Sequence, residues 1–289
     1  MKLIKKTDDY ISELDVGPDA NVRVITADNG NAYTHTGTNT YLIGKQNLAI
    51  LDPGPNLASH LKNIRFGIGT SSVSHIFITH SHQDHCALAL ELAEKTGATI
   101  YLWDEFNHSD IDLIKRIEDK SVKAHKNLRK NFSIKIQRVK DGDEIFNNEW
   151  CLEIISTPGH MFDHICLSLK GVNVIFSGDH VMGWSSSVII PPLGDMTNFL
   201  ASLRKVLNRH ENLYFPAHGP PIIDAKDYVK LQLRHRENRE RQIVKLIELN
   251  PSTPKELRRV LYPKINAYLI EAAEHNIYAH LLDLIKRKL

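Results

Sequence analysis

The chain has 289 residues, of which 42% are hydrophobic and 24% charged. This length and composition suit one large domain, or a domain of about 200 residues with an appendage, and they exclude an intrinsically disordered chain. The formal net charge is only +2, so the whole molecule is not a polyanion binder by charge alone, and any electrostatic preference must be local. Three cysteines without a CxxC pair exclude a disulfide framework and a zinc ribbon.

The sequence shows no membrane or export signal. The first nine residues lack the apolar run of a signal peptide, and no segment approaches the roughly 18 apolar residues of a membrane span. We therefore expect a cytoplasmic protein with reduced cysteines and no membrane contact. Histidine is the unusual residue type, with 16 copies, several of them clustered.

Short β-branched runs alternate with helical segments through the first two thirds of the chain. Runs bounded by Gly, Asn, Asp or Pro predict strands at residues 22–26, 40–43, 48–51, 73–79, 151–156, 172–177 and 213–215. Apolar spacing of helical type predicts helices at residues 86–95 and 198–207, and the charged stretch 111–130 predicts an amphipathic helix or helix pair. The body of the chain is therefore mixed α/β.

The pattern changes to purely helical after residue 222. From residue 225 onward the chain carries 14 Lys and Arg against 8 Asp and Glu, a net charge of +6, whereas the preceding 224 residues carry −4. A hydroxyl cap and a proline in the first turn predict a new helix starting at residues 252–256. We expect two domains, an α/β domain at residues 1–222 and a helical domain at residues 223–289.

Four predicted strands run into residue types that bind metal ions. The strand at 73–79 leads into the sequence HSHQDH, and three later strands each lead into a His or an Asp. Strand ends at one edge of a sheet can converge on a point. The candidate ligands are then five imidazoles and two carboxylates: His80, His82, Asp84, His85, His160, Asp179 and His218. Such a set suits Zn²⁺, with Fe or Mn as poorer fits.

The spacing of these ligands predicts two zinc ions per chain. In an HxHxDH turn the alternation lets His80 and His82 point the same way, toward the ion that His160 would also bind. Asp84, His85 and His218 would hold the second ion, and Asp179 would bridge the pair, since two-metal hydrolytic sites keep their ions about 3.5–4 Å apart. A metal-bound hydroxide, formed because the metal lowers the pKa of water to about 7, would then be the nucleophile.

This motif series is similar to a known family. HxHxDH at 80–85, TPGH at 157–160, Gly178-Asp179 and HGP at 218–220 resemble the metallo-β-lactamase-fold hydrolases. The resemblance implies an αββα sandwich over roughly residues 20–222, with a dimetal site at one edge between the sheets. A closer resemblance is to the β-lactamase-like protein 2 group, through GTNTYL at 37–42, TPGHxxDH at 157–164 and HRxxRE at 235–240. That group carries a winged-helix-like C-terminal region.

Other residues are expected to serve the site. Asp52 resembles the family carboxylate that orients a ligand histidine, although it is also placed to cap the turn that follows it. We expect Asp84, Asp179 and His164 to be catalytic, with His164 contacting the leaving group or, alternatively, making a structural hydrogen bond. Trp184, in the apolar segment 182–192, either walls the substrate pocket or pins this segment to the body. His180 should point away from the site.

Three functions fit these expectations. The first is a dinuclear zinc hydrolase acting on a small ester, thioester, lactone or amide. The second, which the resemblance implies, is a single-stranded-RNA endoribonuclease that uses the same site. Basic residues of the helical region would then attract the phosphates, or they form only a solvated helix face. These residues are Arg234, Arg236, Arg239, Arg241 and Lys245. The third is a mononuclear iron enzyme similar to the persulfide dioxygenases of the fold. The sequence leaves the oligomeric state open.

Overall fold

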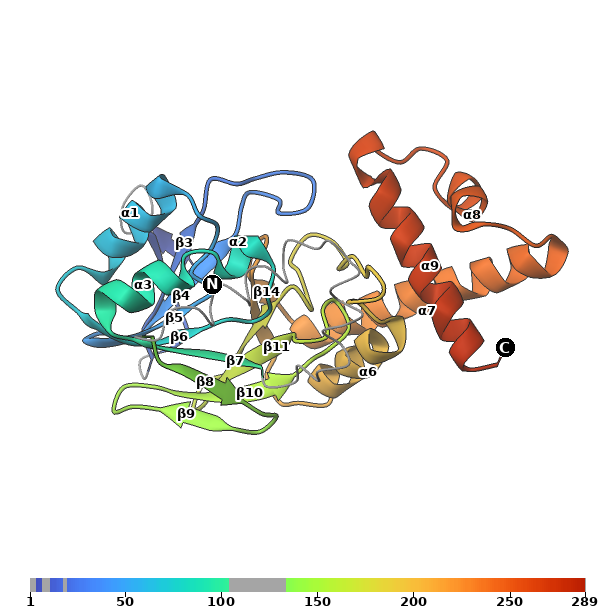
Figure 1. Cartoon of the computed structure of the whole chain (residues 1–289). Helices are drawn as coiled ribbons and strands as arrows, with labels where there is room; N and C mark the ends of the chain where they lie inside the picture. Colours follow the sequence, from blue (N-terminus) through green and yellow to red (C-terminus); the bar gives the residue numbers. More distant parts are fainter. Residues whose placement is uncertain (1–3, 7–10, 18–19, 104–133, 289) are drawn as a thin grey trace.

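A computed structural model of the chain describes residues 4–6, 11–17, 20–103 and 134–288. Two β-sheets pack face to face, and helices cover the outer face of each sheet (Figure 1). The predicted αββα sandwich with a small helical C-terminal region is confirmed. The helix predicted at residues 111–130 lies outside the described residues.

The first sheet follows chain order. Its strands are β1 (Ile4–Lys6), β2 (Ile11–Leu14), β3 (Val22–Thr26), β4 (Asn39–Ile43), β5 (Asn47–Leu51), β6 (Ser72–Phe77), β7 (Thr99–Trp103) and β8 (Ile136–Val139). Neighbours from β1 to β5 are antiparallel, and those from β5 to β8 are parallel. Parallel neighbours need crossover connections. The helices α1 (Ala58–Ile68), α2 (Gln83–Cys86) and α3 (Ala89–Thr96) lie on these crossovers.

The second sheet has the order β14-β13-β12-β11-β10-β9. Its strands are β9 (Glu144–Phe146), β10 (Cys151–Ser156), β11 (Ile165–Leu169), β12 (Val174–Gly178), β13 (Leu213–Pro216) and β14 (Ile222–Ile223). Only β12 and β13 are parallel in this sheet, and α6 (Met196–Leu207) lies on the connection between them. All seven strands predicted from the sequence are present, with ends that differ by at most two residues.

Alternating side chains of the central strands supply two separate cores. In β4 and β6, Leu42 and Ile76 face α1 and α3, whereas Tyr41 and Phe77 face the second sheet. Because both faces are covered, these strands are apolar on both sides. A third core lies between the second sheet and α6, around Phe199.

The arrangement of parallel strands brings the predicted ligands to one edge. The carboxyl ends of β5 and β6 precede Asp52 and the 80–85 turn, and those of β12 and β13 precede Asp179 and His218. The two sheets are tied together there, because the Tyr41 hydroxyl donates a hydrogen bond to the Pro216 carbonyl (2.6 Å). Ligands from both halves of the chain therefore meet at this edge.

The segment predicted as one helix at 86–95 is divided between α2 and α3. Backbone hydrogen bonds explain the break: Gly54 N donates to the His85 carbonyl (2.9 Å), and Leu88 N donates to the Gly54 carbonyl (3.3 Å). In a continuous α-helix the His85 carbonyl would accept from Ala89 N and Leu88 N would donate to the Asp84 carbonyl. The Gly54 backbone takes the place of both partners.

The C-terminal region consists of α7 (Ala225–Leu249), α8 (Pro254–Leu261), η1 (Ala267–Leu269) and α9 (Ile270–Lys286). The helix start predicted at 252–256 is confirmed, because Thr253 and Glu256 form a capping box. The first half of α7 packs on the second sheet, and its second half packs on α8 and α9. The domain boundary at residue 222 stays a prediction. None of the described helices is both long and apolar enough to span a bilayer.

Gly159, in the turn before His160, is required by close packing against α6. Its φ is +142°, and a Cβ at this position would lie 2.3 Å from the Phe199 Cα. We expect Gly159→Ala to lower the free energy of unfolding by about 3 kcal/mol, from steric overlap and backbone strain. Gly171→Ala is the control: φ is +84° with no atom within 4 Å of the added Cβ, so only strain of about 1 kcal/mol applies. Equal losses in urea unfolding would contradict the packing argument.

Candidate metal centre

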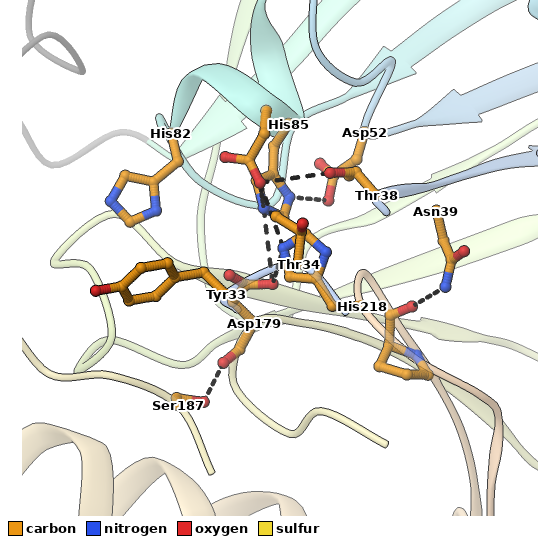
Figure 2. A network of polar contacts seen from close by, with 12 residues as sticks. Tyr33, Thr34, Thr38, Asn39, Asp52, His82, His85, Asp179, Ser187 and His218 are labelled. Carbon is orange, nitrogen blue, oxygen red and sulfur yellow. Dashed lines mark hydrogen bonds and ion pairs between the residues drawn. The ribbon is translucent and has the colours of Figure 1, made fainter. Parts of the chain in front are cut away.

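The seven predicted ligands converge in two groups. The ligand atoms within each group lie within 4.8 Å of one another, the first group being His80, His82, His160 and Asp179 and the second Asp84, His85 and His218. Asp179 lies between the groups: its Oδ2 is 3.6 Å from His160 Nε2, and its Oδ1 is 3.3 Å from His218 Nε2. Figure 2 shows the Asp179 carboxylate facing His85 and His218. The two groups therefore form one continuous centre.

A single buried carboxylate orients one histidine of each group. Asp52 Oδ2 accepts hydrogen bonds from His85 Nδ1 (2.9 Å) and from the Thr79 hydroxyl (2.8 Å), while Oδ1 accepts one from Thr79 N (2.8 Å). Because the Thr79 hydroxyl donates to Asp52, it accepts from His80 Nδ1 (3.0 Å). Asp52 thus holds His85 directly and His80 through Thr79, and it turns the Nε2 atom of both rings toward the centre.

Backbone carbonyls orient two further ligands. His160 Nδ1 donates to the Val188 carbonyl (2.7 Å), and His218 Nδ1 lies 3.3 Å from the Gly37 carbonyl. Both rings therefore present Nε2 to the centre. His82 alone presents Nδ1, at 3.1 Å from His160 Nε2.

The residues present fit metal ions. Ring nitrogens of the first-group imidazoles face one another, with His82 Nδ1 2.8 Å from His80 Nε2 and 3.1 Å from His160 Nε2. A shared cation would stabilise this arrangement. The buried His85 Nε2 of the second group lacks a hydrogen-bond partner among the described residues, and so does Oδ1 of Asp179, the carboxylate between the groups. Unpartnered buried polar atoms are costly, and imidazole nitrogen with carboxylate oxygen is a donor set that suits zinc.

Electrostatics distinguish the two groups. Burial lowers the pKa of His80, His82 and His160, the last to about 4. Burial alone would also lower the pKa of His85 and His218, but nearby carboxylates outweigh it, so the pKa of His85 is raised well above its usual value and that of His218 to about 9. At neutral pH the first group thus offers free lone pairs, whereas the second holds protons that an arriving cation displaces.

The centre opens into a cavity of about 280 Å³. Its walls are largely apolar, and Tyr33, Met182, Val188 and Ile190 line it together with the ligands. A smaller cavity of about 80 Å³ continues from His82 and His160 along apolar side chains, which are Met161, Ile190, Pro191, Pro192 and Leu193. Tyr33 and His82, both labelled in Figure 2, line the larger cavity.

Two predicted site residues, His164 and Trp184, are not among the described residues that line the cavity. His164 is fully buried, with Nδ1 2.8 Å from the Thr157 hydroxyl and Nε2 accepting from Asp179 N (3.1 Å). Since both nitrogens are engaged, His164 holds Asp179 rather than facing the cavity. Trp184 is not among the described residues that line the cavity; its ring packs 5.2 Å from the His35 ring, and its segment reaches the cavity through Met182 instead.

His180 points away from the metal ligands, as predicted. Its ring is fully buried and lies edge-on to Phe199, with ring centroids 5.1 Å apart.

Sequence reasoning missed several contributors to the centre. Thr79 and the Val188 carbonyl orient ligands, and Tyr33 forms part of the wall. A backbone carbonyl carries no sequence signal, and Tyr33 lies in no recognisable motif. The only available hint was the position of Thr79 directly before His80.

The basic set expected to attract RNA is only partly exposed. Arg236 is buried, and Arg239 stacks 4.1 Å over the Tyr262 ring while donating to the Leu261 carbonyl. The other three, Arg234, Arg241 and Lys245, are exposed.

Paired imidazole and carboxylate clusters at the edge of an αββα sandwich define a metal-dependent hydrolase. Residues 33–218 match the metallo-beta-lactamase superfamily, and residues 253–289 match the beta-lactamase associated winged helix domain. The chain therefore belongs to the metallo-β-lactamase superfamily.

Several curated relatives are similar over most of the chain. The beta-lactamase-like protein 2 homolog of Caenorhabditis elegans is 29% identical, over 83% of this chain and 75% of that protein. Lactamase-like protein aptB of Emericella nidulans is 31% identical, over 82% of this chain and 70% of that protein. An atrochrysone carboxyl ACP thioesterase of Claviceps purpurea is 27% identical, over 76% of this chain and 63% of that protein. The chain spans only 59% of lactamase-like protein adaB of Aspergillus niger.

A solved structure shows the same fold. A metallo-beta-lactamase family protein from Thermus thermophilus superposes with a TM-score of 0.68 at 19% identity, covering 98% of this chain and 95% of that one.

The three hydrogen bonds to Asp52 generate a prediction. In Asp52→Asn the amide nitrogen, itself a donor, would replace an oxygen that accepts from Thr79 or His85. The rings of His80 and His85, one in each group, would then be held less firmly. We expect zinc affinity to fall about 10- to 100-fold in chelator competition. The control is Glu211→Gln, which alters a fully buried carboxylate bonded to Ser168 and Arg209. An equal loss of affinity in the control would contradict a specific role for Asp52.

Proposed function

We propose that this protein is a dinuclear zinc hydrolase of small esters or thioesters that carry an apolar acyl group. The observation that supports this is two adjacent ligand groups at the base of an apolar cavity. None of the described residues lining either cavity is Lys or Arg. A phosphodiester polyanion favours basic contacts, so the lining suits a neutral acyl substrate better, and some relatives are named as thioesterases.

The roles of the residues follow from their positions. One ion would be held by His80, His82 and His160. The other would be held by Asp84, His85 and His218, and Asp179 would bind both ions. When bound, zinc supplies Lewis acidity, which lowers the pKa of water and polarises a carbonyl group. The ligand set also disfavours the alternative of a single iron, because its second group would then have no ion to bind.

The chain's own carboxylates differ in their access to the substrate. The Asp84 side chain is 29% exposed against 9% for Asp179. Asp84 Oδ2 faces Thr38, His85 and His218. Asp84 Oδ1 would then receive a proton from the attacking water and pass it to the leaving group. Tyr33 and Ile190 would exclude bulk water and contact the acyl group.

RNA cleavage remains the alternative, and it rests on the exposed basic residues of α7. Lactones and amides are neutral acyl substrates as well, so the lack of Lys and Arg among the described lining residues does not distinguish them from esters and thioesters. The cytoplasmic location expected from the sequence stays a prediction.

We expect purified protein to take up two zinc ions per chain, as measured by elemental analysis. His160→Ala and His218→Ala should each retain about one ion, because each removes a ligand of a different group, whereas the control His210→Ala, at an exposed position, should retain two. Chelation should abolish acyl-thioester hydrolysis, and zinc should restore it. A single iron per chain, or activity on single-stranded RNA but on no ester or thioester, would contradict the proposal.

The apolar wall predicts a preference for apolar acyl groups. Ile190 borders both cavities and is 44% exposed, so Ile190→Asp should fold normally. We expect it to raise KM for medium-chain acyl thioesters about tenfold, the cost of losing roughly 1.4 kcal/mol of apolar contact. Zinc content should not change. Ile223→Asp, on β14 and 61% exposed, is the control and should leave KM unaltered; an unaltered KM in both would count against the assigned wall.

A further inference from the structure

Arg236 of α7 is a buried cation. Its side chain belongs to a residue only 3% exposed, and no ion pair to it occurs in the part of the chain that the structure describes. Its guanidinium lies 5.2 Å from the Phe199 ring centroid. Burying an unpaired charge costs free energy, so the hydrogen bonds of Arg236 must offset that cost.

Those contacts reach the segment that follows Asp179. Arg236 Nη2 donates to the Ser187 carbonyl, and Nη1 donates to Asn276 Oδ1 of α9 (3.2 Å). The same Asn276 oxygen accepts a hydrogen bond from Ile189 N (3.0 Å). Side chains of α7 and α9 therefore hydrogen-bond to the backbone on either side of Val188.

This segment orients two ligands of the first group. The Val188 carbonyl accepts from His160 Nδ1 (2.7 Å), and the Ser187 hydroxyl donates to the Asp179 carbonyl. Figure 2 shows the latter contact below Asp179. A shift of residues 187–189 would thus misdirect His160 and loosen Asp179 together.

We propose that Arg236 and Asn276 are positioning residues of the metal centre, through which the C-terminal helices hold His160 and Asp179 in place for the first metal ion. The inference rests on the proposed metal sites. It assigns Arg236 to the interior of the enzyme instead of to RNA contact, since a residue so deeply buried cannot reach a phosphate.

The test uses full-length protein and measures zinc affinity by chelator competition, with the absorption spectrum of the cobalt-substituted protein as a second readout. Arg236→Met removes both donors. We expect one of the two ions to bind about 10- to 100-fold more weakly and the cobalt spectrum to change. Arg236→Lys keeps the charge but loses the forked geometry, and it should be intermediate.

Asn276 gives an independent arm that does not depend on the folding of the arginine variants. Asn276→Leu should weaken the same ion, whereas Asn276→Asp keeps the acceptor for Ile189 N and should retain wild-type affinity. Arg239→Met is the matched control, because Arg239 lies on the same helix but contacts Tyr262 and Leu261. It should leave both zinc affinities unchanged.

The outcomes separate this inference from the function on which it rests. Wild-type affinity for both ions in folded Arg236→Met and in Asn276→Leu would overturn the inference alone. Equal weakening in Arg239→Met would also overturn it, by showing a general effect of the helical region. Wild-type protein that takes up no zinc would overturn both the proposed function and the inference.

Discussion

One buried carboxylate orients a ligand histidine in each of the two groups of the metal centre. Asp52 follows β5 and accepts three hydrogen bonds, all from Thr79 and His85. It thereby ties the end of β5 to the turn after β6 and fixes a ring in each ligand group. Its backbone has φ of +49°, and the Thr40 hydroxyl donates to its carbonyl (2.6 Å). The hydrogen bond from Thr40 of β4 thus helps to hold this less common backbone conformation. The Asp52 carboxylate in turn fixes the orientation of the His80 and His85 rings.

A second layer of support comes from outside the sandwich. Asp52 orients His80 and His85, which follow β6. The ligands that follow β10 and β12 contact residues 187–189 instead, and these residues contact α7 and α9. Asp283 of α9 also accepts a hydrogen bond from Thr197 of α6, and Lys286 pairs with Asp195. The C-terminal helices are therefore part of the framework of the centre, and Figure 1 shows α7 running from the body into the helical region.

The fold and the ligand set could be predicted because their signals are local. Apolar runs such as residues 22–26 mark strands, and a ligand directly after a strand must lie at the edge of the sheet. The long-range supports could not be predicted in the same way, since the Val188 carbonyl has no residue-specific signal. Arg236 was considered with the exposed basic residues, yet Val229, Leu233 and Ile243 place it on the buried stripe of α7. That spacing was present in the sequence.

The position of the centre between the sheets has a consequence for the resistance of the protein to denaturation. Its ligands lie in turns that follow strands of both sheets, so cations bound there would link the two sheets. A cation that binds only the folded chain stabilises it by mass action. With metal bound at the proposed sites, the free energy of unfolding would therefore be larger than in the metal-free chain, and it would increase with the concentration of free cation.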